Sequence, residues 1–240
     1  MKYNTKFYEN RHNEQAIYTA NKIVGILKEI CPDADSIVDI GCGVGTWLLA
    51  AKEQQIENIF GIDGDWVSDE HLVIPKKQFR RQNLNESFNL DTQYDLAICL
   101  EVAEHIYCDN AAQFIKSITG LSDIILFSAA IPGQGGINHF NEQWPDYWID
   151  LFKKENYVGF DLVRKKIWND DKIPCWYKQN IIVFIAENKI PGLDLKYKAE
   201  DVYPLSIVHP ELYNRKIYSD ISVKEATKVL IKSLIRFLSK

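Results

Sequence analysis

Short apolar runs alternate with amphipathic stretches along most of this chain. One stretch, residues 15–30, places apolar side chains at helical spacing and ends at Cys31-Pro32, which predicts a helix that flanks a sheet and covers a ligand site. Length and apolar composition predict buried strands at residues 36–40, 58–62 and 123–129, just before Gln82, in the apolar part of 94–106, and at 181–186. Strands that alternate with helical patterns indicate an α/β fold with a doubly wound, mostly parallel sheet.

A glycine-rich loop follows the first strand, and a carboxylate precedes it. Asp39 lies two residues before a Gly-x-Gly-x-Gly loop, and a helix is expected to begin near Thr46. A dinucleotide fingerprint would need glycine in place of Thr46, and Asp39 would repel its pyrophosphate. The pairing instead suits the ammonium group of S-adenosylmethionine, although an ordinary strand-to-helix turn is the alternative. The predicted cofactor contacts here are Asp39, Gly41, Cys42, Gly43, Gly45 and Thr46.

The ends of the next two strands offer groups for a ribose and an adenine. Asp63 ends the second strand, where a nucleotide-binding half-domain needs an acceptor for two ribose hydroxyls. The indole of Trp66 is expected to stack on the adenine, and the Asn83 amide to pair with its amino edge. A solvated acidic turn with a core tryptophan is the alternative. Gly64, Asp65 and the backbone N–H of Leu84 complete this set of predicted contacts.

Chemistry is expected where the fourth strand ends and in a later glycine-rich loop. Ligands of open parallel sheets lie at the carboxyl ends of strands, which places Leu100, Glu101, Glu104 and His105 near the cofactor. A structural role for His105 is the alternative. The loop at 130–144 is rich in glycine and polar side chains and is therefore the predicted acceptor site, with Gln134, His139, Asn141, Glu142, Gln143 and Trp144 as candidates.

A hydroxyl acceptor needs a general base, and neutral histidine suits that role near pH 7. His139 is the first candidate and His105 the second, with Glu104 or Glu142 orienting the imidazole. His105, His139 and the nearby carboxylates could also form a metal site, but no motif of defined ligand spacing is present, so no metal is predicted. An aromatic wall for the acceptor, with core packing as the alternative, is expected from Trp144, Tyr147, Trp148, Trp168, Trp176 and Tyr177. Arg164, Lys165 and Lys166 suit either a phosphate on the acceptor or a solvated strand end.

The order of these motifs from about Asn13 to Glu187 resembles the class I S-adenosylmethionine-dependent methyltransferases. The resemblance implies a Rossmann-like sheet of seven strands with the last antiparallel, and S-adenosylhomocysteine as the product. Residues 127–148, with Ile167-Trp168, Trp176-Tyr177 and Gln179-Asn180, are similar to a bacterial branch that often accompanies surface-polysaccharide and capsule biosynthesis. That similarity implies O-methylation of a saccharide-type acceptor. The family commonly has Asp where this chain has Asn83.

Other functions compatible with the sequence are methylation of a phosphoryl, phosphoramidate or other small-molecule acceptor, and a catalytically silent cofactor-binding partner subunit. A nicotinamide oxidoreductase is disfavoured by Asp39 and Thr46.

Composition narrows the partners and the compartment. The chain has 240 residues, 46% of them hydrophobic, which is enough for one substantial core. Its formal net charge of −5 gives no overall attraction for polyanions, so nucleic acid is not the expected acceptor. Five cysteines without Cys-x-x-Cys spacing suit reduced thiols in the cytoplasm, and no signal peptide or membrane span is recognisable.

The sequence predicts a catalytic domain over 1–189 and a C-terminal extension over 190–240. Ser222 to Glu225 is typical of a capping box that opens a terminal helix. That helix would carry a basic face and an apolar stripe, which suit an anionic membrane surface, a partner, its own domain or a second subunit in a homodimer.

Overall fold

The computed structural model describes residues 12–193 and 205–217, together with residues 227, 228, 230, 231, 234, 235 and 237. Contacts divide the chain into two units, Met1–Ile207 and Val208–Lys240. The first unit continues beyond the predicted boundary at 189 because its segment near residue 205 is bonded to it. Arg164 donates to the carbonyl of Leu205 at 2.7 Å, and Ser206 donates to Asp146 at 2.7 Å.

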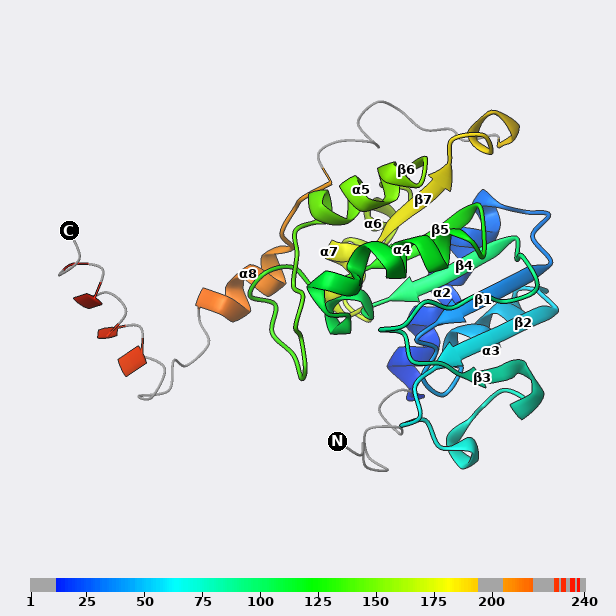
Figure 1. Ribbon diagram of the computed structural model, residues 1–240, viewed down its shortest axis with the longest axis horizontal. Coiled ribbons are helices and arrows are strands. Elements are labelled where there is room, and N and C mark those ends of the chain that lie inside the picture. The colour runs from blue at the N-terminus through cyan, green and yellow to red at the C-terminus, as the bar shows by residue number, and fades with distance from the viewer. Residues whose placement is uncertain are drawn as a thin grey trace. The chain divides into compact units, whose positions relative to one another are not determined.

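A seven-stranded sheet forms the centre of the first unit (Figure 1). Its order is β3-β2-β1-β4-β5-β7-β6, and β7 runs antiparallel to both of its neighbours. The strands are β1 (Ser36–Ile40), β2 (Asn58–Asp63), β3 (Phe79–Arg81), β4 (Leu96–Leu100), β5 (Ile124–Ser128), β6 (Tyr157–Phe160) and β7 (Ile182–Ala186). The doubly wound fold with an antiparallel strand is thereby confirmed.

Helices cover both faces of the sheet (Figure 1). The α-helices of the first unit are α2 (Glu14–Ile30), α3 (Thr46–Glu53), α4 (Ala111–Thr119), α5 (Pro145–Lys154), α6 (Arg164–Ile167) and α7 (Cys175–Asn180). Short 3-10 turns are η1 (Asp69–His71), η2 (Lys76–Gln78), η3 (Ala103–His105), η4 (Cys108–Asn110) and η5 (Ile190–Gly192). The predicted helix at 15–30 is confirmed as α2, whose N-cap Asn13 accepts a hydrogen bond from the Ala16 N–H at 2.8 Å.

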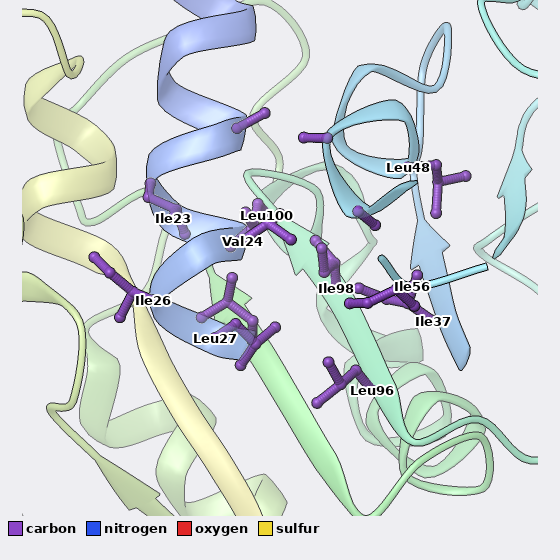
Figure 2. Packing of buried hydrophobic residues seen from close by; sticks show 14 of the residues in the cluster. Ile23, Val24, Ile26, Leu27, Ile37, Leu48, Ile56, Leu96, Ile98 and Leu100 are labelled. Atoms are coloured by element: carbon purple, nitrogen blue, oxygen red, sulfur yellow. The ribbon is translucent and has the colours of Figure 1, made fainter. Parts of the chain in front are cut away.

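The central strands place their side chains alternately in two cores, which is why most of their residues are apolar. Ile98 of β4 packs in one core with Ile23 and Leu27 of α2 (Figure 2). The neighbouring Ala97 and Cys99 point to the opposite core, which is formed with helices α4 and α5. Both faces of β4 are therefore packed against apolar side chains, and polar groups can gather only at its carboxyl end.

The second unit contains α8 (Pro210–Ile217). The predicted capping box at 222–225 lies outside the described residues. Those residues of the predicted terminal helix that the structure describes are helical, and the apolar ones are exposed, namely Leu230, Ile231, Leu234, Ile235 and Phe237. Among the described residues, no helix combines the length and apolar character needed to cross a bilayer.

Candidate active site

The glycine loop after β1 is held against the end of β2. The backbone N–H groups of Gly41 and Cys42 both donate to the carbonyl of Ile62, at 2.8 and 3.2 Å. Gly41 has a φ of +79°, and a Cβ there would collide with Val102. Gly43 has a φ of +55° and faces open space, with nothing within 4 Å of a Cβ built on it. Gly43 is thus the position in the loop where a ligand can approach the backbone.

Asp39 lies in β1, two residues before this loop, and is 2% exposed. No described residue forms a hydrogen bond with its Oδ2. Burial, with a further contribution from the nearby Asp63 carboxylate, raises the pKa of Asp39 well above its usual range. A buried carboxylate oxygen without a donor is unfavourable, so a donor supplied by a ligand would stabilise it.

Asp63 joins the end of β2 to the glycine loop. Its carboxylate accepts hydrogen bonds from the N–H groups of Gly43, at 2.7 Å, and Gly64, at 2.6 Å. The indole of Trp66 lies over Gly64, where a Cβ would collide with it, yet Trp66 remains 48% exposed. Asp65 is exposed beside it. The predicted ribose and adenine groups therefore lie around one end of β2.

Asn83 and Thr46 both have protein partners in this structure. The Asn83 amide donates to Glu86 at 2.8 Å and accepts from the Asn85 N–H at 3.1 Å, while Leu84 is buried in the core. The hydroxyl of Thr46 bonds to His12 at 3.1 Å. An adenine contact by Asn83 stays a prediction, and it requires the amide to exchange its partners in the turn.

Glu101 follows β4 in the left-handed conformation, with a φ of +55°. A non-glycine residue in this region indicates strain that the surroundings must hold. Its carboxylate accepts from Gln134 at 2.8 Å and from Asn180 at 3.0 Å, and Asn180 also donates to Gln134 at 2.9 Å. Burial raises the pKa of Glu101, although these hydrogen bonds and that from Ser128 oppose the shift. Buried Leu100 precedes it.

Three of the predicted catalytic side chains meet beyond Glu101. Glu104 and His105 lie on η3, and His139 comes from the loop after β5. Glu104 Oε1 and His139 Nε2 are 3.9 Å apart, and the ring centroids of His105 and His139 are 4.9 Å apart. Glu104 is 1% exposed, and its burial, together with the Glu101 charge, raises its pKa well above the usual range.

Glu142 organises the loop around His139. Its carboxylate accepts from His139 Nδ1 at 2.9 Å and from the N–H groups of Gly133 and Gly135, each at 2.7 Å. Partial burial opposes ionisation of Glu142, but these donors outweigh it and hold its pKa below the usual value. The expected pairing of His139 with a carboxylate is therefore present in the structure.

Some of the other predicted acceptor residues lie on the surface, and others are buried in the core. Trp144 is exposed, and buried Asn141 accepts from Gln143 at 3.0 Å. Trp148 is only 2% exposed and packs on Phe127 in the core, so in this structure it does not line an acceptor wall. Tyr177 packs edge-on against Trp47 with centroids 5.4 Å apart.

Arg164 and Asn180 have roles that the sequence did not predict. Arg164 is fully buried and donates to the carbonyl of Gln179 at 2.9 Å and to Asp161 at 3.0 Å, so it is neither a phosphate ligand nor a solvated group here. Asn180 supports Glu101. The sequence signal for Asn180 was its place just before the last apolar run, but nothing in the pattern pairs it with a residue so far away.

Known methyltransferases resemble this chain in sequence and in fold. Residues 11–121 match the sequence profile of a methyltransferase domain family. Magnesium protoporphyrin IX methyltransferase from Synechocystis, crystallised with bound S-adenosylmethionine, has a TM-score of 0.51 at 16% identity, over 78% of this chain and 87% of that chain. This chain has the methyltransferase fold.

Two further structures share that methyltransferase fold. The sugar N-methyltransferase KedS8 from a Streptoalloteichus species has a TM-score of 0.57 at 12% identity, over 78% of this chain and 94% of that chain. The plantazolicin methyltransferase BpumL, in complex with S-adenosylhomocysteine, has a TM-score of 0.52 at 14% identity, over 75% and 87% of the two chains. No curated protein sequence matches this one. At these identities the likeness concerns the fold.

Proposed function

We propose that this protein is an S-adenosylmethionine-dependent methyltransferase that methylates an oxygen of a small saccharide-type acceptor. The observation that carries the proposal is the buried Asp39 carboxylate, whose Oδ2 has no partner among the described residues, in the strand that leads into the glycine loop with its open backbone at Gly43. A ligand with an ammonium group would supply the missing donor, and the amino-acid end of S-adenosylmethionine has that chemistry.

The rest of the cofactor would extend along the ends of β1 and β2. Asp63 would accept from the ribose hydroxyls in exchange for one of its two backbone donors, and the exposed Trp66 ring would cover the adenine. The sulfonium would then lie toward the end of β4, near Glu101. This arrangement follows the general placement of ligands at the carboxyl ends of parallel strands.

The acceptor oxygen is proposed to lie at Glu104, His105 and His139. S-adenosylmethionine, when bound, would supply an electrophilic methyl group to this oxygen, and its sulfur would keep the electron pair of the carbon–sulfur bond to give S-adenosylhomocysteine. Alignment of oxygen, carbon and sulfur supplies much of the rate. His139 Nε2 would take the hydroxyl proton while Glu142 holds Nδ1, at 2.9 Å.

A saccharide acceptor is proposed from the polar loop 130–144 and its exposed Trp144, because sugars combine hydroxyls with apolar ring faces. The sugar N-methyltransferase of the same fold is compatible with this class of acceptor. Since that relative methylates nitrogen according to its name, amino sugars belong in the acceptor screen beside hydroxyl and phosphoryl acceptors.

Calorimetric titration with S-adenosylmethionine tests the cofactor proposal. The wild-type chain should bind it, and Asp63→Ala should bind at least roughly tenfold more weakly because a charge-assisted contact is lost. Asp91→Ala removes an exposed carboxylate and serves as the matched control, with wild-type affinity expected. Equal affinity of Asp63→Ala and wild type would remove Asp63 from the ribose contact. Binding without transfer to any acceptor would favour the silent partner subunit.

A further inference from the structure

We propose that Glu104, His105 and His139 form a binding site for one divalent transition-metal cation. Each residue offers one ligand atom, and the three atoms lie within 4.8 Å of one another. The 3.9 Å between Glu104 Oε1 and His139 Nε2 is too long for a hydrogen bond. It is within the upper limit of about 4.4 Å for two ligands that each lie about 2.0–2.2 Å from a metal such as zinc. A small inward movement of the two side chains would therefore let them share one ion.

Glu104 provides a second, independent observation. Its side chain is almost completely buried, and no described residue forms a hydrogen bond with Oε2. A buried carboxyl oxygen without a partner is costly, whereas buried charges are commonly paired or coordinate metals. A cation bound by this carboxylate would offset the cost of its buried negative charge.

Both imidazoles also have the outer hydrogen bonds that metal-bound histidines usually make. His139 Nδ1 faces the Glu142 carboxylate at 2.9 Å, and His105 Nδ1 faces the Asn138 carbonyl at 3.1 Å. Because each partner is an acceptor, Nδ1 carries the proton in each neutral ring. The lone pair of each ring is therefore on Nε2, where a cation can take it.

Backbone contacts hold the two contributing segments together. The N–H groups of Phe140 and Asn141 both donate to the Glu104 carbonyl, at 2.9 and 3.0 Å. Gly136 packs so closely on the His139 imidazole that a Cβ at that position would collide with it. The segments that carry the three ligands are thus held next to each other by the fold itself.

The donor set selects the class of cation. Two imidazoles and one carboxylate suit Mn²⁺, Fe²⁺, Co²⁺ or Zn²⁺, whereas Mg²⁺ and Ca²⁺ prefer oxygen ligands. Three protein ligands leave positions for an acceptor hydroxyl, and this role rests on the proposed function. The bound cation would lower the hydroxyl pKa so that its proton leaves to water, and His139 would act as a ligand in place of a base.

The test uses the full chain without a histidine tag, stripped of metal with a chelator. Titration with Mn²⁺, followed by the loss of its free-ion electron paramagnetic resonance signal, should show one cation bound per chain. Co²⁺ should give a visible absorption spectrum of mixed nitrogen and oxygen coordination. His139→Asn and His105→Gln should each weaken binding at least tenfold, because even the outer partners of metal ligands are worth roughly 10- to 100-fold.

His71→Asn is the matched control, since His71 is a partly buried histidine outside this cluster, and it should bind like wild type. Gly136→Ala keeps all three ligands but displaces the His139 ring, so it too should bind more weakly. No binding by the wild type, or equal binding by the ligand variants, would overturn the metal site.

S-adenosylmethionine titration of the chelated protein separates this proposal from the proposed function. Asp39 and Asp63 are not ligands of the cation, so cofactor affinity should be the same with and without chelator. Cofactor binding without cation binding overturns the metal site alone. Cation binding without cofactor binding overturns the proposed function alone.

Discussion

At the scale of single residues, Asp39 destabilises the folded protein but offers a carboxylate to a cationic ligand. Its carboxylate is buried, one oxygen has no described donor, and Asp63 adds a second negative charge nearby. In the ligand-free protein this arrangement favours the protonated form. A cationic ligand reverses that preference, so cofactor binding and ionisation of Asp39 are expected to be coupled.

Replacing Asp39 with Asn should therefore raise the thermal unfolding temperature of the ligand-free protein near neutral pH. The folded-state pKa of Asp39 is raised, so the folded form binds more protons than the unfolded form, and stability falls as pH rises from the ordinary value toward the raised one. The advantage of Asp39→Asn should appear above about pH 4 and vanish below it. Thermal unfolding followed across pH measures this difference.

The same Asp39→Asn variant should bind S-adenosylmethionine roughly 10- to 100-fold more weakly, because one charge-assisted hydrogen bond becomes neutral. Calorimetry at pH 7 checks the affinity. Unchanged binding, or a lower unfolding temperature at neutral pH, would contradict this account of Asp39.

At the scale of elements, two glycines of the same loop have different roles: Gly41 is needed for packing, and Gly43 leaves room for a ligand. Gly41 faces Val102 from the turn after β4, whereas Gly43 faces open space. Both have positive φ, so alanine strains either position, but only Gly41→Ala adds a collision inside the protein.

Gly41→Ala should lower the free energy of unfolding by about 2–4 kcal/mol, from backbone strain plus overpacking. Gly43→Ala should cost only about 1–2 kcal/mol and should chiefly weaken cofactor binding, because its Cβ occupies the ligand side. Denaturant unfolding and calorimetry on both variants distinguish the effects. If Gly43→Ala were the less stable of the two variants, the Val102 side chain would have to move aside easily to accommodate the new Cβ at position 41.

Arg164 connects α6 to the segment before β7 and to the segment at residue 205. Arg164→Met should destabilise the fold by about 3–5 kcal/mol, because it leaves Asp161 and two carbonyl groups buried without their donor. Lys166→Met is the matched control. Its amine forms an exposed pair with Glu29 at 2.7 Å, and such pairs contribute roughly 0–1 kcal/mol. Urea denaturation of both variants compares them.

At the scale of the whole molecule, the rate at which each thiol reacts depends on whether the fold buries or exposes that cysteine. Cys31, Cys42, Cys99 and Cys175 are buried, and Cys108 is exposed. Burial raises the pKa of Cys31 to about 11 and that of Cys42 and Cys99 well above the usual value. The thiolate is the reactive form, so buried thiols react slowly.

A chromogenic aromatic disulfide should therefore react rapidly with one thiol per native chain and with all five cysteines after denaturation. Cys108→Ser should abolish the rapid phase. Fast reaction of a second thiol in the native protein would indicate local opening of one of the buried positions.

Much of the fold could be predicted because its strands are buried on both faces. β1, β2, β4, β5 and β7 are apolar runs that periodicity detects directly. β6 was missed because it has only four residues, Tyr157–Phe160, between polar segments. The sequence also proposed Glu104 and His105 as candidates because they follow the end of a strand, and His139 because it lies in a polar, glycine-rich loop.

The sequence could not show how those side chains face one another. That arrangement depends on two hydrogen bonds from the 130–144 loop to the carbonyl of Glu104, which no periodicity records. Trp148 illustrates the opposite problem. Its residue type suits an acceptor wall as well as a core, and only the packing on Phe127 decides between them.

The reversed direction of β7 has a consequence for the order in which the site is made. Because β7 runs opposite to β5, Asn180, which lies just before β7, is at the sheet end where Glu101 follows β4. Asp39, the glycine loop and Asp63 leave the ribosome long before Asn180 is synthesised. A growing chain can therefore pair β1 with β2 early, while the left-handed Glu101 lacks its second amide partner, Asn180, until the segment before the last strand emerges. Completion of the active site is thus tied to completion of the sheet.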